Sequence, residues 1–536
     1  MAALSLVILD LVLIQPNHPE AMAWDAFLLF PLELPVIVAA LLALGRSRVG
    51  VALRAVLVAA LTFIVVLKTV DFVMFTSLSR AFNPVGDLPL VGSFYDLIVG
   101  NLGSVAAISA VIGAVLVILA LAAALWWAMG VWTRLSLPKA WAASLGVFAI
   151  LGAGLVAADI SKRSGGWSAP FAYPGTAFTT RVGVERIEIA RKTLADLLVF
   201  QTAAQNDPFT NRPGLFDLVD RDVIVVFVES YGRTSFDTPL YADLHLETLA
   251  NAQADLAARG LSMASTFLTS PTQGGQSWLA HSTFANGLWI PNQTSYRAAL
   301  ASGRQTLFHL AQQAGFHTAA VMPQITLDWP EAQVMGFDTV LAEADLGYRG
   351  LPFNWITMPD QFTFAAMDRL LRNKRTQDRP FFIQMALGSS HAPWVPVPDL
   401  IEWENLGDGT IFDPVVIASD TPRVVWSDRD RVRVQYRLAV DYALQTAFAY
   451  AALHAEAPPL MIILGDHQAA GSIALDERPH VPLHIVGPRP LVDLIADADF
   501  TAGLIPAETT PARRMDLMRA HILQTLSSQQ TTEVDR

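Results

Sequence analysis

The sequence predicts a two-part protein: a multi-span α-helical membrane domain, followed by an external α/β domain with a mostly parallel sheet and helices on both faces. Of its 536 residues, 53% are hydrophobic and only 16% are charged, whereas soluble globular proteins carry about a quarter charged residues. Apolar stretches of spanning length fill the first third, and short apolar strands alternate with helical stretches in the remainder. A purely soluble protein is therefore excluded.

The membrane domain is expected over residues 1–158, with about five helices. Four apolar stretches, at about 24–45, 51–77, 104–128 and 140–158, approach the roughly 20 residues that a bilayer core demands. Ala2–Ile14 is shorter; we interpret it as a first span, and an interfacial segment or a truncated start are the alternatives.

Basic residues lie between the second and third stretches and between the fourth and fifth, which predicts that these loops stay in the cytoplasm. They are Arg46, Arg48, Arg54, Arg134 and Lys139. Five spans then place the C-terminal domain on the outer, periplasmic side of the cytoplasmic membrane. Lys68 and Asp71, three apart, are expected to pair on one helix face. Loop 78–103 is expected outside, where it would help shape lipid access.

Beyond the membrane domain, we expect a membrane-surface linker over 159–215, a catalytic α/β domain over 216–527 and a polar tail over 528–536. The linker contains a helical run from Val182 to Gln201 and ends at the breaker signal Pro213-Gly214. About 310 residues are ample for one large core. The stretch around Ala512–Ser527 is expected as a closing helix.

Charge and cysteine content exclude several function classes. Lys and Arg number 36 against 48 Asp and Glu, and the net charge of −12 argues against nucleic acid and anionic lipid surfaces as electrostatic partners. The chain has no cysteine, which excludes disulfides, thiolate nucleophiles, Cys-ligated zinc and iron–sulfur clusters.

Polar residues follow the ends of several apolar runs of the α/β domain. Glu229 follows one run, Asp466 and His467 a second, and His391 a third, while a fourth runs toward Trp329. The runs are Val223–Val228, Met461–Leu464, Phe381–Leu387 and Thr318–Met322. Ligands bind at the carboxyl ends of strands in doubly wound sheets, so these side chains are expected at one edge. Glu, Asp and His suit Mn²⁺, Zn²⁺ or Mg²⁺; an Asp-His pair alone is more often a turn or a cap.

Ser277 is the candidate nucleophile, in the run Thr-Gln-Gly-Gly-Gln-Ser277-Trp. Two glycines let the backbone approach a ligand, and Ser277 then opens a short helix that Asn286-Gly287 closes. Backbone N–H groups at a helix N-terminus favour a phosphate or sulfate. The alternative is that Ser277 is only a helix N-cap. A metal-bound serine ionises near neutral pH, so both roles are compatible.

With these residues in place, the chain resembles the alkaline phosphatase and sulfatase superfamily, and most closely its membrane-anchored lipoteichoic-acid synthase and phosphoglycerol transferase branch. The resemblance covers the architecture and five motifs in order. The motifs are Val-Phe-Val-Glu229-Ser, Gly-Gly-Gln-Ser277, Ser-Ser-His391-Ala-Pro, Leu-Gly-Asp466-His467 and Val481-Pro-Leu-His-Ile. The resemblance implies one divalent metal, Mn²⁺ or Zn²⁺ with Mg²⁺ as a further option. Its ligands would be Glu229, Asp466, His467 and Ser277, with Ser277 as nucleophile where the branch usually has threonine.

The resemblance also implies that His391, Trp329 and His480 bind substrate. The arginine that accompanies the tryptophan in the lipoteichoic branch is missing, since Pro330-Glu331-Ala332 follows Trp329. The sulfatase branch is disfavoured, because Trp-Leu-Ala-His follows Ser277 in place of Pro or Ala and then Arg. Phosphoethanolamine transferases usually have disulfides, which this chain cannot form, and an alkaline phosphatase would need a second set of ligands.

We therefore expect a metal-dependent phosphotransferase that moves a phospho-headgroup from a membrane phospholipid to an envelope glycan or glycolipid through a covalent Ser277 intermediate. Two alternatives stay open at this point. With water as the acceptor, the protein would be a phosphodiesterase or another hydrolase of the same fold; without activity, it would be an envelope scaffold. The donor headgroup, the acceptor, the metal and the oligomeric state also stay open.

Overall fold

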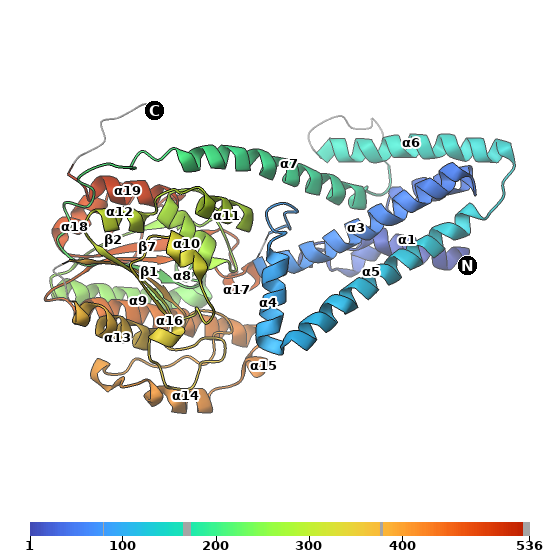
Figure 1. Ribbon diagram of the computed structural model, residues 1–536. Coiled ribbons are helices and arrows are strands. Elements are labelled where there is room, and N and C mark those ends of the chain that lie inside the picture. The colour runs from blue at the N-terminus through green and yellow to red at the C-terminus, as the bar shows by residue number, and fades with distance from the viewer. Residues whose placement is uncertain (79, 164–172, 376–378, 529–536) are drawn as a thin grey trace. The chain divides into compact units, whose positions relative to one another are not determined.

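The computed structural model describes residues 1–78, 80–163, 173–375 and 379–528 (Figure 1). The chain divides into two compact units, Met1–Asp196 and Leu197–Arg536. The predicted domain boundaries at 158 and 215 stay predictions. The polar tail predicted over 528–536 lies outside the described residues except for Ser528, whose backbone N–H donates to Asp217 Oδ1 at 2.7 Å.

The first unit is built from helices. They are α1 (Ala2–Ile14), α2 (Glu33–Leu44), α3 (Arg48–Leu78), α4 (Leu90–Leu102), α5 (Ser104–Thr133), α6 (Lys139–Arg163) and the start of α7 (Phe178–Gln205). Among the described residues, three helical stretches are long and apolar enough to cross a membrane: Arg48–Leu78, Ser104–Thr133 and Lys139–Lys162. The helical run predicted from Val182 to Gln201 is confirmed within α7.

The apolar stretch at 24–45 does not form the single span that the sequence predicted. It is divided into a short 3₁₀ helix, Trp24–Leu28, and α2, which has only 12 residues. Pro31 lies at the break; proline lacks the N–H that a continuous helix needs and disfavours helix in the residue before it. The expected loop at 78–103 is also largely helical, because α4 occupies its second half.

Lys68 and Asp71 do not pair with each other, contrary to the prediction. The Lys68 ammonium donates to the Leu13 carbonyl at 3.0 Å and to the Thr179 hydroxyl at 2.7 Å. Asp71 Oδ2 instead lies 2.9 Å from Nη2 of Arg186. Thr179 and Arg186 both belong to α7. The spacing of Lys68 and Asp71 on α3 predicted that they pair with each other, but α7 supplies a partner for each of them.

The second unit is an α/β domain around a nine-stranded sheet of order β4-β3-β5-β1-β6-β7-β2-β8, with β9 paired to β2. The strands are β1 (Val223–Val228), β2 (Ser262–Thr269), β3 (His317–Met322), β4 (Thr339–Ala342), β5 (Phe381–Leu387), β6 (Leu460–Gly465), β7 (His480–Gly487), β8 (Thr501–Ala502) and β9 (Ala512–Arg514). The five strands from β4 to β6 run parallel, which confirms the predicted mostly parallel sheet. Beyond β6, β7 is antiparallel to both β6 and β2.

Helices cover both faces of this sheet, as predicted (Figure 1). They are α8 (Thr234–Asp237), α9 (Pro239–Ala258), α10 (Ser277–Asn286), α11 (Gln293–Ala301), α12 (Leu307–Gln313), α13 (Asp360–Leu370), α14 (Asp413–Ala418), α15 (Pro422–Val425), α16 (Arg429–Leu453), α17 (Gly471–Ala474), α18 (Arg489–Ile495) and α19 (Leu517–Thr525). Alternate side chains of β1 enter the two cores. Ile224 and Val226 pack in the core with α9, α13 and α16, whereas Val225 and Phe227 pack in the core with α10, α12, α18 and α19.

The end of the chain differs from the prediction. The stretch Ala512–Ser527, expected as one closing helix, begins with the strand β9 and becomes helical only at Leu517. β9 pairs in parallel with the C-terminal end of β2, where Phe267 lies opposite Ala512. Three residues are too few for an alternating pattern to show in the sequence.

Candidate metal centre and active site

Three side chains of the kind that bind metals converge at the carboxyl ends of β1 and β6. Glu229, Asp466 and His467 each present one potential ligand atom, and these atoms lie within 4.8 Å of one another. Val228 lies opposite Gly465 in the parallel β1–β6 pair, so the next residue on each strand, Glu229 and Asp466, emerges at the same height. We refer to Glu229, Asp466 and His467 as the ligand cluster.

The backbone around the ligand cluster is packed tightly. A Cβ added to Gly465 would lie 1.8 Å from the carbonyl oxygen of Tyr231, so no side chain fits there. Ser230 takes a left-handed conformation with φ of 58°. From that position its N–H donates to Asp466 Oδ1 at 2.9 Å and its hydroxyl donates to Glu229 Oε1 at 3.1 Å. Ser230 thereby holds both carboxylates in place.

His467 is oriented as metal-binding histidines usually are. Its Nδ1 lies 3.0 Å from the backbone carbonyl of Gln468, which can only accept, so the ring proton is assigned to Nδ1. Nε2 lies 3.1 Å from Glu229 Oε1 and is the nitrogen that would face a metal ion, which would replace its proton. Two carboxylates and a free imidazole nitrogen are a donor set that fits Mn²⁺, Zn²⁺ or Mg²⁺.

The electrostatics of the ligand cluster favour a cation. Burial and the nearby charge of Glu229 raise the pKa of Asp466 well above its usual range. Burial also opposes ionisation of Glu229, but the charges of His467 and His391 hold the pKa of Glu229 well below its usual range. Burial disfavours the charged form of His467 too, yet Asp466 and Glu229 raise its pKa to about 9. Two buried carboxylates thus draw positive charge into this site.

Ser277 completes the site as the first residue of α10. Its hydroxyl donates to Glu229 Oε2 at 2.8 Å, and its Oγ lies 3.3 Å from His467 Nε2. The N-cap position belongs to Gln276, with φ of 66°, so Ser277 is not the N-cap. The helix ends at Gly287 in the left-handed conformation, φ of 62°, which confirms the predicted stop.

Gln468 links the loop that precedes Ser277 to the loop of the ligand cluster. Its carbonyl accepts from the N–H of Gly274 at 2.8 Å, and a β-bridge joins Gln273 to Gln468. Its side-chain oxygen accepts from the N–H of Thr234 at 2.9 Å, and its amide donates to the carbonyl of Arg478 at 2.9 Å. Our sequence analysis missed this residue, whose only signal is that it directly follows Asp466-His467.

His391 lies after β5 on a turn that Asp360 holds. The Asp360 Oδ1 atom accepts from the N–H groups of Gly388 at 2.8 Å and Ser389 at 2.9 Å. The ring of His391 stacks with that of Trp355, with centroids 6.4 Å apart and planes inclined by 22°. Trp355 is 45% exposed, and an exposed aromatic beside a reactive centre is suited to substrate contact. From the sequence alone, Asp360 is expected to be a solvated surface charge or part of a structural pair, with substrate binding as the alternative, and Trp355 has no predicted role.

His480 and Trp329 were also predicted to bind substrate. β7 is antiparallel to β6, so His480, its first residue, lies at the edge of the ligand cluster. The Trp329 ring is partly buried and packs against the core that contains α10, α12, α18 and α19. Its centroid lies 6.2 Å from that of the Phe337 ring. Within the described ranges, neither side chain has a hydrogen bond or a ring contact to the ligand cluster. Their role in substrate binding stays a prediction.

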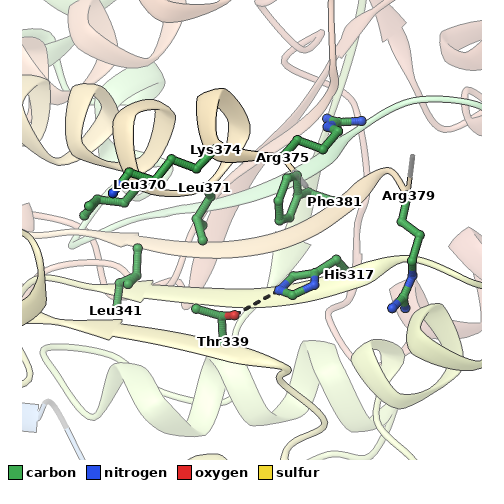
Figure 2. Close-up of a pocket in the computed structure, with 9 residues that line it drawn as sticks. All are labelled: His317, Thr339, Leu341, Leu370, Leu371, Lys374, Arg375, Arg379 and Phe381. Carbon is green, nitrogen blue, oxygen red and sulfur yellow. Dashed lines mark hydrogen bonds between the residues drawn. The ribbon is translucent and has the colours of Figure 1, made fainter. Parts of the chain in front are cut away.

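A separate cavity of about 300 Å³ lies at the opposite ends of the strands (Figure 2). Its walls include His317, Thr339 and Phe381, which begin β3, β4 and β5, together with Lys374 and Arg375. The residues of the ligand cluster follow the carboxyl ends of their strands, so this cavity is not part of the candidate active site.

The chain is similar to known proteins in its second unit. The sulfatase family model matches residues 221–483, a range that contains Ser277, His391 and the whole ligand cluster. No curated protein matches the chain.

Several solved structures also match at low identity. The lipoteichoic acid synthase LtaP from Listeria monocytogenes is 15% identical over 53% of this chain and 70% of its own, with a TM-score of 0.35. The Streptococcus pyogenes phosphoglycerol transferase GacH, in complex with sn-glycerol-1-phosphate, is 13% identical over 63% and 82%, with a TM-score of 0.37. The C-terminal periplasmic domain of EptC from Escherichia coli is 16% identical over 52% and 74%, with a TM-score of 0.32.

Proposed function

We propose that the protein is a metal-dependent phosphotransferase of the cell envelope, because residues 221–483 match the sulfatase family model. It takes a phospho-headgroup of the phosphoglycerol type from a membrane phospholipid and passes it to an envelope glycan or glycolipid. The observation that carries the proposal is the position of Ser277 Oγ, 2.8 Å from Glu229 Oε2 and 3.3 Å from His467 Nε2. A hydroxyl embedded among metal-ligand atoms at a helix N-terminus is placed to act as a nucleophile toward phosphorus.

The ligand cluster and Ser277 would hold one divalent metal, Mn²⁺, Zn²⁺ or Mg²⁺. Two carboxylates, one imidazole and one hydroxyl are the donor types that these ions accept. A bound divalent ion lowers the pKa of a coordinated hydroxyl and offsets negative charge on phosphoryl oxygens.

The residues of the chain account for the two transfer steps. In the first, Ser277 Oγ forms a bond to the headgroup phosphorus, the bond from phosphorus to the diacylglycerol oxygen breaks, and the serine proton ends on that oxygen. In the second, a hydroxyl of the acceptor bonds to the same phosphorus, Ser277 leaves and regains a proton. His391, at the edge of the ligand cluster and stacked on Trp355, is placed to hold the headgroup.

Membrane anchoring suits a lipid donor. The first unit contains three helices long and apolar enough to span a membrane. Such helices keep the catalytic domain at the surface where the phospholipid lies. We place the protein in the cytoplasmic membrane as a multi-pass protein, with the catalytic domain on the outer side, where glycan acceptors are found.

Diacylglycerol release tests the proposal. The full-length protein is added to vesicles that contain labelled phosphatidylglycerol or labelled phosphatidylethanolamine, with Mn²⁺ or Zn²⁺. We compare the wild type with Ser277→Ala and with Ser282→Ala, a matched serine on the same helix. We expect release from one of the lipids, lost by at least about a thousandfold in Ser277→Ala and largely kept in Ser282→Ala.

Each other outcome points elsewhere. Full release by Ser277→Ala would remove Ser277 as the nucleophile. Release of the headgroup into water at a rate that no glycan acceptor changes would favour a hydrolase. A purified protein that binds no metal and releases nothing would favour a scaffold.

A further inference from the structure

We infer that the first unit contains a binding site for a neutral lipid with a free hydroxyl, centred on Glu33. A cavity of about 400 Å³ lies among α1, α2, α3, α6 and α7 of this unit, a size within the range of small-molecule sites. Its walls are apolar except for Glu33, Thr179 and Thr180. All five helices contribute to the apolar walls, for example through Leu13, Val36, Ile64, Val156 and Ile187.

Glu33 leaves one hydrogen-bond acceptor unused in this cavity. Its Oε1 accepts from the N–H of Thr180 at 2.9 Å and from the hydroxyl of the same residue at 3.1 Å. Its Oε2 is buried and has no hydrogen-bond partner among the described residues, and the whole residue is only 6% exposed. A buried oxygen without a partner costs free energy, which a ligand that donates a hydrogen bond would recover.

The polar groups of the lining favour a ligand that donates a hydrogen bond over an anionic one. The lining contains no lysine or arginine within the described part of the chain. The ammonium of Lys68 is already occupied by the Leu13 carbonyl and the Thr179 hydroxyl. A phosphodiester group offers Glu33 Oε2 no hydrogen-bond donor, whereas a free hydroxyl on an apolar chain can donate to this oxygen while the chain packs against the walls.

Diacylglycerol is the neutral lipid that we assign to this site. It carries one free hydroxyl and long apolar chains, and it is the product that the proposed reaction leaves in the membrane. This assignment rests on the proposed function, whereas the class of ligand rests on the cavity and Glu33 alone. The site would retain the product after headgroup transfer.

The test uses a photoreactive diacylglycerol and the full-length protein in lipid nanodiscs. All proteins carry Ser277→Ala, so that labelling is independent of turnover. Gly183→Leu fills the cavity, because a Cβ at this position already lies 3.3 Å from Ile64 Cδ1, which lines the same wall. Gly113→Leu is the matched control on α5, where a Cβ has no neighbour within 4 Å among the described residues.

We expect labelling to fall about tenfold in Glu33→Gln, which keeps the size of the side chain but replaces one carboxyl oxygen with an amide group that cannot accept a hydrogen bond. We expect at least as large a fall in Gly183→Leu. Gly113→Leu should label like the parent. Equal labelling of Gly183→Leu and Gly113→Leu would overturn the site. If Gly183→Leu does not fold, unchanged labelling of Glu33→Gln would overturn it instead.

Competition identifies the ligand. Unlabelled diacylglycerol should suppress labelling, and phosphatidylglycerol with the same acyl chains should not. Equal competition by phosphatidylglycerol would refute selection for a neutral lipid. Equal competition by a prenol would keep the hydroxyl-lipid site and overturn its assignment to diacylglycerol. Because the nucleophile is absent throughout, failure of this test and failure of the proposed transferase activity are distinguishable.

Discussion

Replacing Asp360 with asparagine should stabilise the second unit at pH 8 and change little in mild acid. Asp360 is fully buried, and its Oδ1 already accepts two backbone N–H groups, from Gly388 and Ser389. Its Oδ2 has no hydrogen-bond partner in the described ranges of the chain. Burial outweighs the hydrogen bonds and raises the pKa of this carboxyl from 3.8 to about 6.

The sign and the size of the effect follow from this shift. The folded state binds the Asp360 proton more tightly than the unfolded state does. The stability that this protonated carboxyl contributes is therefore present in full below about pH 4 and is lost as the pH rises through about 6. A shift of about two pKa units corresponds to roughly 3 kcal/mol at pH 8. Asparagine keeps the Oδ1 acceptor and has no charge, but its amide must find an acceptor. We therefore expect a net gain of about 2 kcal/mol at pH 8 and about zero at pH 4.5.

Urea unfolding of the full-length protein in detergent, followed by tryptophan fluorescence at pH 4.5 and pH 8, measures this difference. Asp368→Asn is the matched control on the same helix. Burial opposes ionisation of Asp368, but hydrogen bonds from His454 and Tyr450 and the charge of Arg372 lower its pKa, so this control should lose stability at pH 8. An equal loss of stability in Asp360→Asn at both pH values would refute the reasoning.

Three further predictions test the site and the helical unit. His391→Ala should lower kcat/KM for the donor lipid about tenfold or more while atomic emission still finds bound metal, and loss of the metal would contradict a substrate role. Gly465→Ala should cost at least about 2 kcal/mol and abolish metal binding, because the new Cβ meets the Tyr231 carbonyl; normal metal content would argue against the tight packing seen here. Asp71→Asn should lower the free energy of unfolding by about 3 kcal/mol, since it leaves Arg186 buried without its carboxylate, and addition of Arg186→Met should restore most of this loss in detergent melts.

The sequence was informative where one physical rule decided the outcome. β1 and β5 begin and end at the predicted residues, because strands buried on both faces are almost entirely apolar; Gln384 is the one polar residue in these two strands. The strand-end rule then brought Glu229, Asp466 and His467 together without any knowledge of the loops between them.

The sequence was uninformative where a side chain finds its partner on an element far away along the chain. The partner of Asp71 lies 115 residues away on α7, and no local spacing indicates Arg186. Asp360 looks like an ordinary surface charge until the turn after β5 folds over it. Trp355 lies in a loop, where periodicity gives no signal.

The link between Gly274 and Gln468 has a consequence for how substrate preference can change. The loop before Ser277 and the loop of the ligand cluster are joined by a hydrogen bond between two backbone groups. Such a bond depends little on side-chain identity. This link keeps the distance between the Ser277 loop and the ligand cluster fixed. Trp355 and His391, which we propose to contact the headgroup, belong to other loops. Substitutions at Trp355 and His391 would then change which headgroup the site accepts, while the proposed chemistry at Ser277 stays the same.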